Sequence, residues 1–266
     1  MSVIHHTRTG AGAPALIFIH AFGCARSDWD AQVVGFSSCY ETVAVDLGGH
    51  GTTPAKPDHI RVEAHAEDVL DLMSGLDLRS CVIVGNSLGC RIALEVASRA
   101  PARTRAVVLV DGSRLGSPGI TGHAALGNGV DAADYRDFVV GMFAKMFSPA
   151  FDPPRVSEMT RRAQALEPGF ATRLLADVGR HDCEKMDELL AAVRVPLLAI
   201  QSTRITPDGQ RISLSPGETS PYLELLKASV PGVAVNIIAN SGHYPQIEQA
   251  HATNAALKAF LQSIDE

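Results

Sequence analysis

The sequence has no excess of basic residues. Its 23 lysines and arginines are outnumbered by 29 aspartates and glutamates, which gives a formal net charge of −6. Without a positive field to gather phosphates, the chain is not expected to bind nucleic acid or an anionic membrane surface. It also lacks any apolar run near the roughly 20 residues that cross a bilayer, and it lacks the basic and apolar segments of an export signal.

Cysteine pairs and metal-binding patterns are equally absent. The five cysteines form no CxxC pair, and an odd number of thiols without an export signal favours reduced cysteines in a cytoplasmic protein. The ten histidines include no HExxH and no Cys/His cluster, so the sequence predicts no metal site and no cofactor. The oligomeric state is left open, and a homodimer is one arrangement that the sequence allows.

What the sequence does contain is an alternation of short β-branched runs with helical patterns. The run Ala15–Ile19 is apolar throughout, as expected of a strand buried on both faces. Similar runs follow at residues 42–45, 81–84, 106–110, 195–200 and 233–238. Helical spacing of apolar residues recurs between them at 63–76, 88–99, 222–230 and 253–264. The alternation predicts an α/β fold with a mostly parallel sheet flanked by helices, and residues 2–9 are expected to add an edge strand.

The alternation stops between residues 113 and 194, where no strand pattern is found. Residues 134–147 instead place their apolar side chains on one stripe of a helix. We therefore expect a core made of residues 1–112 and 195–266, with residues 113–194 inserted as a helical cap. The glycine-rich stretch 116–129 is expected to form a mobile access loop at the start of this cap.

The segment Gly85-Asn86-Ser87-Leu88-Gly89 follows one predicted strand and opens a predicted helix. A sharp turn at this point would lift the Ser87 hydroxyl clear of the sheet, and the two glycines would leave room for the tight backbone. The helix start would direct free N–H groups toward the same point. A chance GxSxG in a loop would have neither the strand before it nor the helix after it, so we interpret Ser87 as a nucleophile.

The segment Ser241-Gly242-His243-Tyr244-Pro245 follows the last predicted strand. A serine hydroxyl is a poor nucleophile until a base takes its proton. His243 lies after Ser87 in the chain, which is the order expected on a sheet of this kind. A lone histidine is usually a polar surface residue, but its position after a strand favours a role as general base.

A third segment, His20-Ala21-Phe22-Gly23, follows the strand Ala15–Ile19. The oxyanion of a tetrahedral intermediate needs two backbone N–H donors. We assign one of them to Phe22 in this loop and the other to Leu88, the residue after the nucleophile. Taken alone, the segment is also compatible with a simple glycine-punctuated turn.

These segments together resemble the α/β-hydrolase superfamily, in its serine-nucleophile branch with a helical cap. The resemblance covers nearly the whole chain, and the similar segments are His20–Gly23 with Ala21 in place of the usual glycine of HG-x-G, Asp46–Gly51 for D-x-x-G-x-G, Gly85–Gly89 for the nucleophile elbow, and Ser241–Pro245 for G-H-x-P. It implies an α/β-hydrolase fold with the cap inserted after the sixth family strand. Because few residues precede Ala15, it also implies that the first family strand is missing.

The resemblance leaves two positions for the acid of the catalytic triad. The family commonly carries its acid after the strand that is here 195–200, but Ile205 occupies that position. Asp208 comes three residues later, in a polar turn, whereas Asp111 ends the run 106–110 and matches a known alternative placement. Because a rigid strand end holds catalytic geometry better than a loop, we prefer Asp111.

The predicted activity is hydrolysis of an ester or lactone, a small-molecule substrate, through an acyl-serine intermediate. A serine at position 87 argues against the haloalkane dehalogenases and epoxide hydrolases of the superfamily, which use an aspartate there. Cleavage of a C–C bond, a lyase reaction on the same triad, and a ligand receptor of the same fold stay open as alternatives.

The cap stripe indicates the kind of substrate. Phe138, Met142, Phe143 and Met146 are expected to line a pocket for a medium-sized apolar or aromatic molecule. In the long polar loop 201–221, Arg204 and Arg211 are interpreted as solvated surface residues, with pairing to a substrate carboxylate as the alternative.

Overall fold

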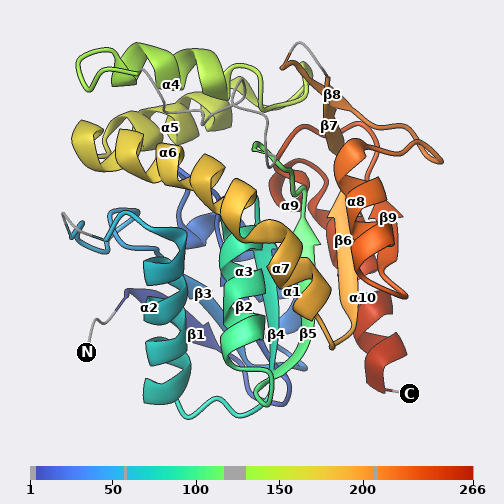
Figure 1. Cartoon of the computed structure of the whole chain (residues 1–266). Helices are drawn as coiled ribbons and strands as arrows, with labels where there is room; N and C mark the ends of the chain where they lie inside the picture. Colours follow the sequence, from blue (N-terminus) through green and yellow to red (C-terminus); the bar gives the residue numbers. More distant parts are fainter. Residues whose placement is uncertain (1–3, 57–58, 117–129, 207–208, 266) are drawn as a thin grey trace.

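Seven strands form one sheet in the computed structural model, which describes residues 4–56, 59–116, 130–206 and 209–265 (Figure 1). The strands are β1 (His6–Thr9), β2 (Ala15–Ile19), β3 (Thr42–Val45), β4 (Cys81–Asn86), β5 (Thr104–Val110), β6 (Leu197–Gln201) and β9 (Ala234–Ile237). Their order across the sheet is β1-β3-β2-β4-β5-β6-β9. Only β1 pairs antiparallel with its neighbour, and it is the predicted edge strand. The predicted α/β fold is therefore confirmed.

Alternate residues of the buried strands enter two separate cores. On β2, Leu16 and Phe18 pack with the helices α1 (Asp30–Phe36) and α10 (Ala250–Asp265). Ile17 and Ile19 of the same strand enter the core on the opposite face. Because successive strand side chains point to opposite faces, a strand covered on both sides must be apolar throughout, which is why these runs could be recognised in the sequence.

The opposite face of the sheet is covered by other helices. They are α2 (Val62–Gly75), α3 (Leu88–Arg99), α7 (Met186–Ala192) and α8 (Pro221–Ser229). Helix α3 contacts β4 and β5 along most of its length and is buried on nearly every side. The short elements η1 (Arg26–Trp29) and α9 (Pro245–Glu248) lie against each other beside α1.

Helices α4 (Tyr135–Phe143), α5 (Pro153–Gln164) and α6 (Pro168–Glu184) stand over the carboxyl ends of the parallel strands (Figure 1). Helix α4 packs on α5 and α6, and α6 also contacts α2. We propose that α4, α5 and α6 form the cap, whereas α7 packs on the core helices α3 and α8. The core boundary that we proposed at residue 195 then moves before α7. The expected access loop falls largely on residues 117–129, outside the described residues.

A small hairpin was not anticipated in the loop between residues 201 and 221. It consists of β7 (Thr203–Ile205) and β8 (Arg211–Ser213), which pair antiparallel. Each strand has only three residues and is rich in polar side chains, so neither carries a periodic apolar signal. The hairpin places Arg211 next to the end of β6, beside the candidate site described below.

Candidate active site

The turn at Ser87 joins β4 to α3 and forces an unusual backbone. Ser87 has φ 54° and ψ −106°, a conformation that non-glycine residues rarely adopt. The flanking glycines are required by close packing: a Cβ on Gly85 would lie 2.0 Å from the carbonyl oxygen of Gly89, and a Cβ on Gly89 would lie 2.3 Å from that of Ile19. The strained turn projects Ser87 beyond the carboxyl end of β4, as the motif predicts.

Ser87 and His243 line the same small cavity, of about 30 Å³. The hydroxyl of Ser87 has no hydrogen-bond partner within the described part of the chain. Hydrogen bonds of this kind often close only when substrate is bound. Phe22 and Leu88 also line the cavity, and their backbone N–H groups donate to no other group in the described ranges. Two free donors therefore lie at the same cavity as the serine.

His20 explains how the Phe22 N–H is aimed. The backbone N–H of Leu47 donates to Nε2 of His20 at 3.0 Å, so Nδ1 carries the proton and donates to the carbonyl oxygen of Ala21 at 2.7 Å. Because a trans peptide is planar, fixing the Ala21 carbonyl points the N–H of Phe22 in the opposite direction. The sequence showed His20 only as the first residue of the HG-x-G-like segment, and its positioning role becomes visible in the structure.

His243 lies against Asp111, which follows the end of β5. Nδ1 of His243 is 2.6 Å from Oδ2 of Asp111, and both side chains are buried. Asp208, the other position considered for the acid, falls outside the described residues. The geometry leaves Nε2 of His243 as the ring nitrogen available on the cavity side.

Asp111 is surrounded by donors. Its Oδ1 accepts from the backbone N–H of Ser202 at 2.9 Å and of Thr203 at 2.7 Å, and its Oδ2 accepts from the Thr203 hydroxyl at 2.6 Å. Nη1 of Arg211 lies 3.0 Å from Oδ2 as well. Arg211 is only 12% exposed, so it is not the solvated surface residue that the sequence suggested; the hairpin of β7 and β8 folds it onto the acid.

Burial is the main reason why His243 is neutral at physiological pH. Burial, together with the nearby positive charge of Arg211, lowers the pKa of His243 to about 4. Burial works to raise the pKa of Asp111, but the hydrogen bond from His243, the charge of Arg211 and the hydrogen bond from Thr203 outweigh it and hold this pKa below its usual value. A neutral imidazole next to an ionised carboxylate can accept a proton at Nε2.

Asn86 and Gln246 connect the serine turn to the histidine loop. Nδ2 of Asn86 donates to the carbonyl oxygens of Val110 at 2.9 Å and His243 at 3.2 Å, while its Oδ1 accepts from Gln246 at 3.1 Å. Asn86 occupies the first variable position of the GxSxG motif, where one sequence gives no sign of such a role. These bonds fix the distance between the two loops that carry Ser87 and His243.

A buried ion pair supports the other side of the turn. Arg91 donates to both carboxylate oxygens of Asp182 on α6, at 2.7 and 2.6 Å, and to the carbonyl oxygens of Ser87 and Ser113. Both members of the pair are fully buried. Arg91 lies one helical turn after the serine, so its position could be read from the sequence, but its partner in α6 could not.

The segment that follows α4 is fixed to the histidine loop. The backbone N–H of His243 donates to the carbonyl oxygen of Met146 at 2.6 Å, and the Tyr244 hydroxyl contacts the Met146 sulfur at 3.1 Å. Oε2 of Glu248 accepts from the N–H groups of Gly242 and Ser148. The proposed cap is thus anchored at the loop that holds His243.

The four predicted substrate-binding residues of the cap separate into two pairs. Met142 and Met146 line the cavity over Ser87, whereas Phe138 and Phe143 are not among the described residues that line it. Phe143 is fully buried and packs against Gly23, where an added Cβ would lie 3.0 Å from its ring. Phe138 is half-buried against the same core. Helix α4 therefore turns one edge of its apolar stripe to the cavity and the rest to the core.

Within the described ranges, no group of three or more His, Cys, Asp or Glu side chains is placed to hold a metal ion. Cys90, beside the serine turn, is buried, and burial raises the pKa of its thiol to about 12, so the thiol stays protonated. No helix among the described residues is both long and apolar enough to cross a membrane.

Several known proteins are similar to this chain. It is 25% identical over 256 residues to lipase 3 of a Moraxella species, covering 94% of this chain and 78% of the lipase. It is 24% identical over 278 residues to the dihydrolipoyllysine-residue acetyltransferase component of the acetoin cleaving system of Cupriavidus necator, covering 97% of this chain. The chain spans 66% of the length of that second protein.

Solved structures share the fold. A thermophilic esterase from Thermogutta terrifontis superimposes with a TM-score of 0.80 and 22% identity, covering 98% of this chain and 93% of the esterase. The enol-lactonase from Burkholderia xenovorans gives a TM-score of 0.77 and 21% identity, covering 97% and 96%. The sequence model of the alpha/beta hydrolase family matches residues 16–256. The chain therefore belongs to the alpha/beta hydrolase family, and the superfamily predicted from its motifs is confirmed.

Proposed function

We propose that the protein is a serine hydrolase that cleaves a carboxylic ester or lactone through an acyl-serine intermediate. The observation that carries the proposal is the 2.6 Å contact between His243 and Asp111, which borders a cavity shared by Ser87 and two free backbone N–H groups. A nucleophile, a base, an acid and two oxyanion donors are the groups that acyl transfer requires.

Each residue has a defined step in the proposed reaction. Nε2 of His243 takes the proton of Ser87 as its oxygen attacks the carbonyl carbon, and the N–H groups of Phe22 and Leu88 stabilise the oxyanion. Asp111 holds the imidazole in the tautomer with a proton on Nδ1 and stabilises its charged form. His243 then gives the proton to the leaving alcohol, and afterwards takes one from the water that releases the acid.

The cavity lining supports an apolar acyl or alcohol group. Besides Met142 and Met146, it is formed by apolar residues that include Leu115, Leu175 and Val178. A cavity of about 30 Å³ holds only one or two water molecules, so a substrate must move flexible side chains to enter. Methionine adapts its shape easily, so Met142 and Met146 suit this role. The names of the relatives, a lipase, an esterase and an enol-lactonase, also favour ester bonds.

The nucleophile is tested by Ser87→Ala with a small ester such as p-nitrophenyl butyrate. Loss of the attacking oxygen should lower kcat by roughly three orders of magnitude or more, with little change in Tm. The exposed Ser38→Ala is the matched control and should keep full activity. If Ser87→Ala kept more than a tenth of the activity, the proposed function would be wrong.

The acid is tested by comparing Asp111→Asn with Asp208→Asn. The first substitution preserves shape but favours the wrong tautomer of His243, so kcat should fall by roughly four orders of magnitude. The second should leave kcat near the wild-type value, since an aspartate in a Pro-Asp-Gly sequence is expected mainly to support its own backbone. Steady-state kinetics of both variants decide the matter, and the reverse result would assign the acid to Asp208.

Arg211 provides a prediction for pH dependence. Its positive charge lowers the pKa of His243, so Arg211→Gln should raise this pKa. His243 would then be protonated, and inactive as a base, up to a higher pH, and the acidic limb of the kcat/KM profile should move to higher pH. Arg211→Lys keeps the charge and should keep the limb in place. A uniform loss of rate in Arg211→Gln, without a shift of the limb, would mean that Arg211 acts only through structure.

Because Met142 lines the cavity and Phe143 packs in the core, substitution of these two neighbours should have different effects. Met142→Ala enlarges the cavity and should increase kcat/KM for long-chain esters relative to acetate esters, at nearly unchanged Tm. Phe143→Ala removes a fully buried ring and should cost about 3–5 kcal/mol of unfolding free energy. Chain-length profiles and denaturant unfolding of both variants check this. A change of chain-length preference in Phe143→Ala at full stability would contradict the assignment.

A further inference from the structure

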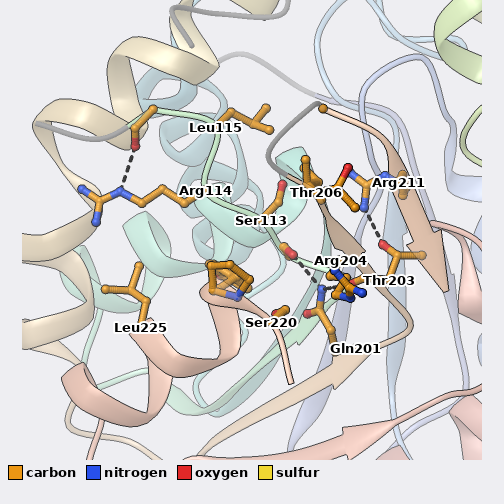
Figure 2. A pocket seen from close by; sticks show the side chains of 16 residues that line it. Ser113, Arg114, Leu115, Gln201, Thr203, Arg204, Thr206, Arg211, Ser220 and Leu225 are labelled. Carbon is orange, nitrogen blue, oxygen red and sulfur yellow. Dashed lines mark hydrogen bonds between the residues drawn. The ribbon is translucent and has the colours of Figure 1, made fainter. Parts of the chain in front are cut away.

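A second cavity lies beside the acid of the proposed triad and is separate from the cavity over Ser87 (Figure 2). Its volume is about 440 Å³, within the range of roughly 300–1,000 Å³ that is usual for small-molecule sites. Its walls come from the segment after β5, from the β7–β8 hairpin and from the first turns of α8. Leu115 is shared with the Ser87 cavity, whereas Ser87 and His243 do not line the larger one.

Two buried polar groups on this wall lack partners. The hydroxyl of Tyr222 and Oε1 of Gln201 make no hydrogen bond within the described part of the chain, although the two residues are only 5% and 2% exposed. The Gln201 side chain is held in place because its Nε2 donates to the carbonyl oxygens of Gly112 and Thr203. Leaving such groups unpaired costs stability, so each calls for an explanation. Both atoms are covered by neighbouring groups, so a bound molecule that supplies the missing partners must also displace the groups that cover them.

The charges at the cavity favour an anion. Three arginines line it, and two of them are paired: Arg114 with Asp187, and Arg211 with Asp111. The guanidinium of Arg204 has no carboxylate partner among the described residues. One positive charge is therefore left over at the cavity wall, and it matches a single negative charge on a ligand.

Another part of the wall is apolar. Leu115, Ile205, Pro221, Leu225 and the ring of Tyr222 cover it. In Figure 2, Leu225 of α8 lies on one side of the cavity, and Arg204 and Arg211 lie on the other. Burial raises the pKa of Tyr222 well above its usual value, so its hydroxyl stays protonated and able to donate.

We propose that this cavity binds a small apolar carboxylate that also carries a hydroxyl or amide N–H group. The carboxylate pairs with Arg204 and accepts a hydrogen bond from Tyr222, the hydroxyl or N–H donates to Oε1 of Gln201, and the apolar body lies against Leu115 and Leu225. The binding requires no reaction at Ser87, so it does not depend on the proposed hydrolase activity.

The test is calorimetric titration of the wild-type protein with phenyllactate, 6-hydroxyhexanoate and N-acetylleucine. At least one should bind saturably with one molecule per chain, and the primary amide of that molecule should bind about tenfold more weakly because it cannot pair with Arg204. If none of the three binds saturably, or if the neutral amide binds as well as the acid, the proposal is wrong.

Variants separate this cavity from the one over Ser87, because Arg204 and Tyr222 do not line the latter. Arg204→Gln should weaken the acid about tenfold. Arg79→Gln, which removes an exposed arginine before the start of β4, should change nothing. Equal affinity in wild type and Arg204→Gln would place the ligand elsewhere and overturn the proposal.

The Tyr222→Phe variant distinguishes a ligand-binding role of Tyr222 from a structural role. Its hydroxyl has no partner among the residues that the structure describes, so its removal should leave the Tm of the free protein unchanged or higher, while the affinity for the acid falls several-fold. A lower Tm together with unchanged affinity would show that Tyr222 serves the fold and not a ligand.

Discussion

The structure around the site depends on one buried carboxylate. An ionised aspartate in a protein interior is unfavourable unless several donors surround it. Asp111 is fully buried, and its donors come from the end of β6, from the β7–β8 hairpin and from the loop after β9. Asp111 itself, the stretch 202–211 and His243 are far apart in the sequence and meet at this one carboxylate. Loss of Asp111 would leave both His243 and Arg211 buried without their shared partner.

The sheet brings these segments together. The parallel register places Asn86 beside Val110, and Val110 beside Ile200, so the loops after β4, β5 and β6 leave the sheet at one edge. Ligand sites of open α/β sheets commonly form at this edge. Arg211 belongs to the Asp111 network and also lines the larger cavity, so the acid and the proposed carboxylate site share one wall.

The sequence predicted what local patterns encode. Continuous apolar runs identified the buried strands, and β2 and β3 begin and end where expected. The GxSxG segment predicted the serine turn because Gly85 meets a local steric requirement, the close approach of the Gly89 carbonyl oxygen. Contacts between distant segments carry no such local pattern. The pairing of Arg211 with Asp111, the pairing of Arg91 with Asp182 and the inward packing of Phe143 depend on tertiary structure, so they could not be predicted.

We propose that Ser87 is made reactive by His243, which Asp111 holds in place. Labelling with an alkyl p-nitrophenyl phosphonate tests it directly, because the reagent releases nitrophenolate when an activated serine attacks it. Peptide mass spectrometry should find one phosphonyl group per chain, on Ser87. The rate constant should fall by orders of magnitude in His243→Ala, since the serine then lacks its base. Labelling of another residue, or an equal rate in the two proteins, would contradict the account.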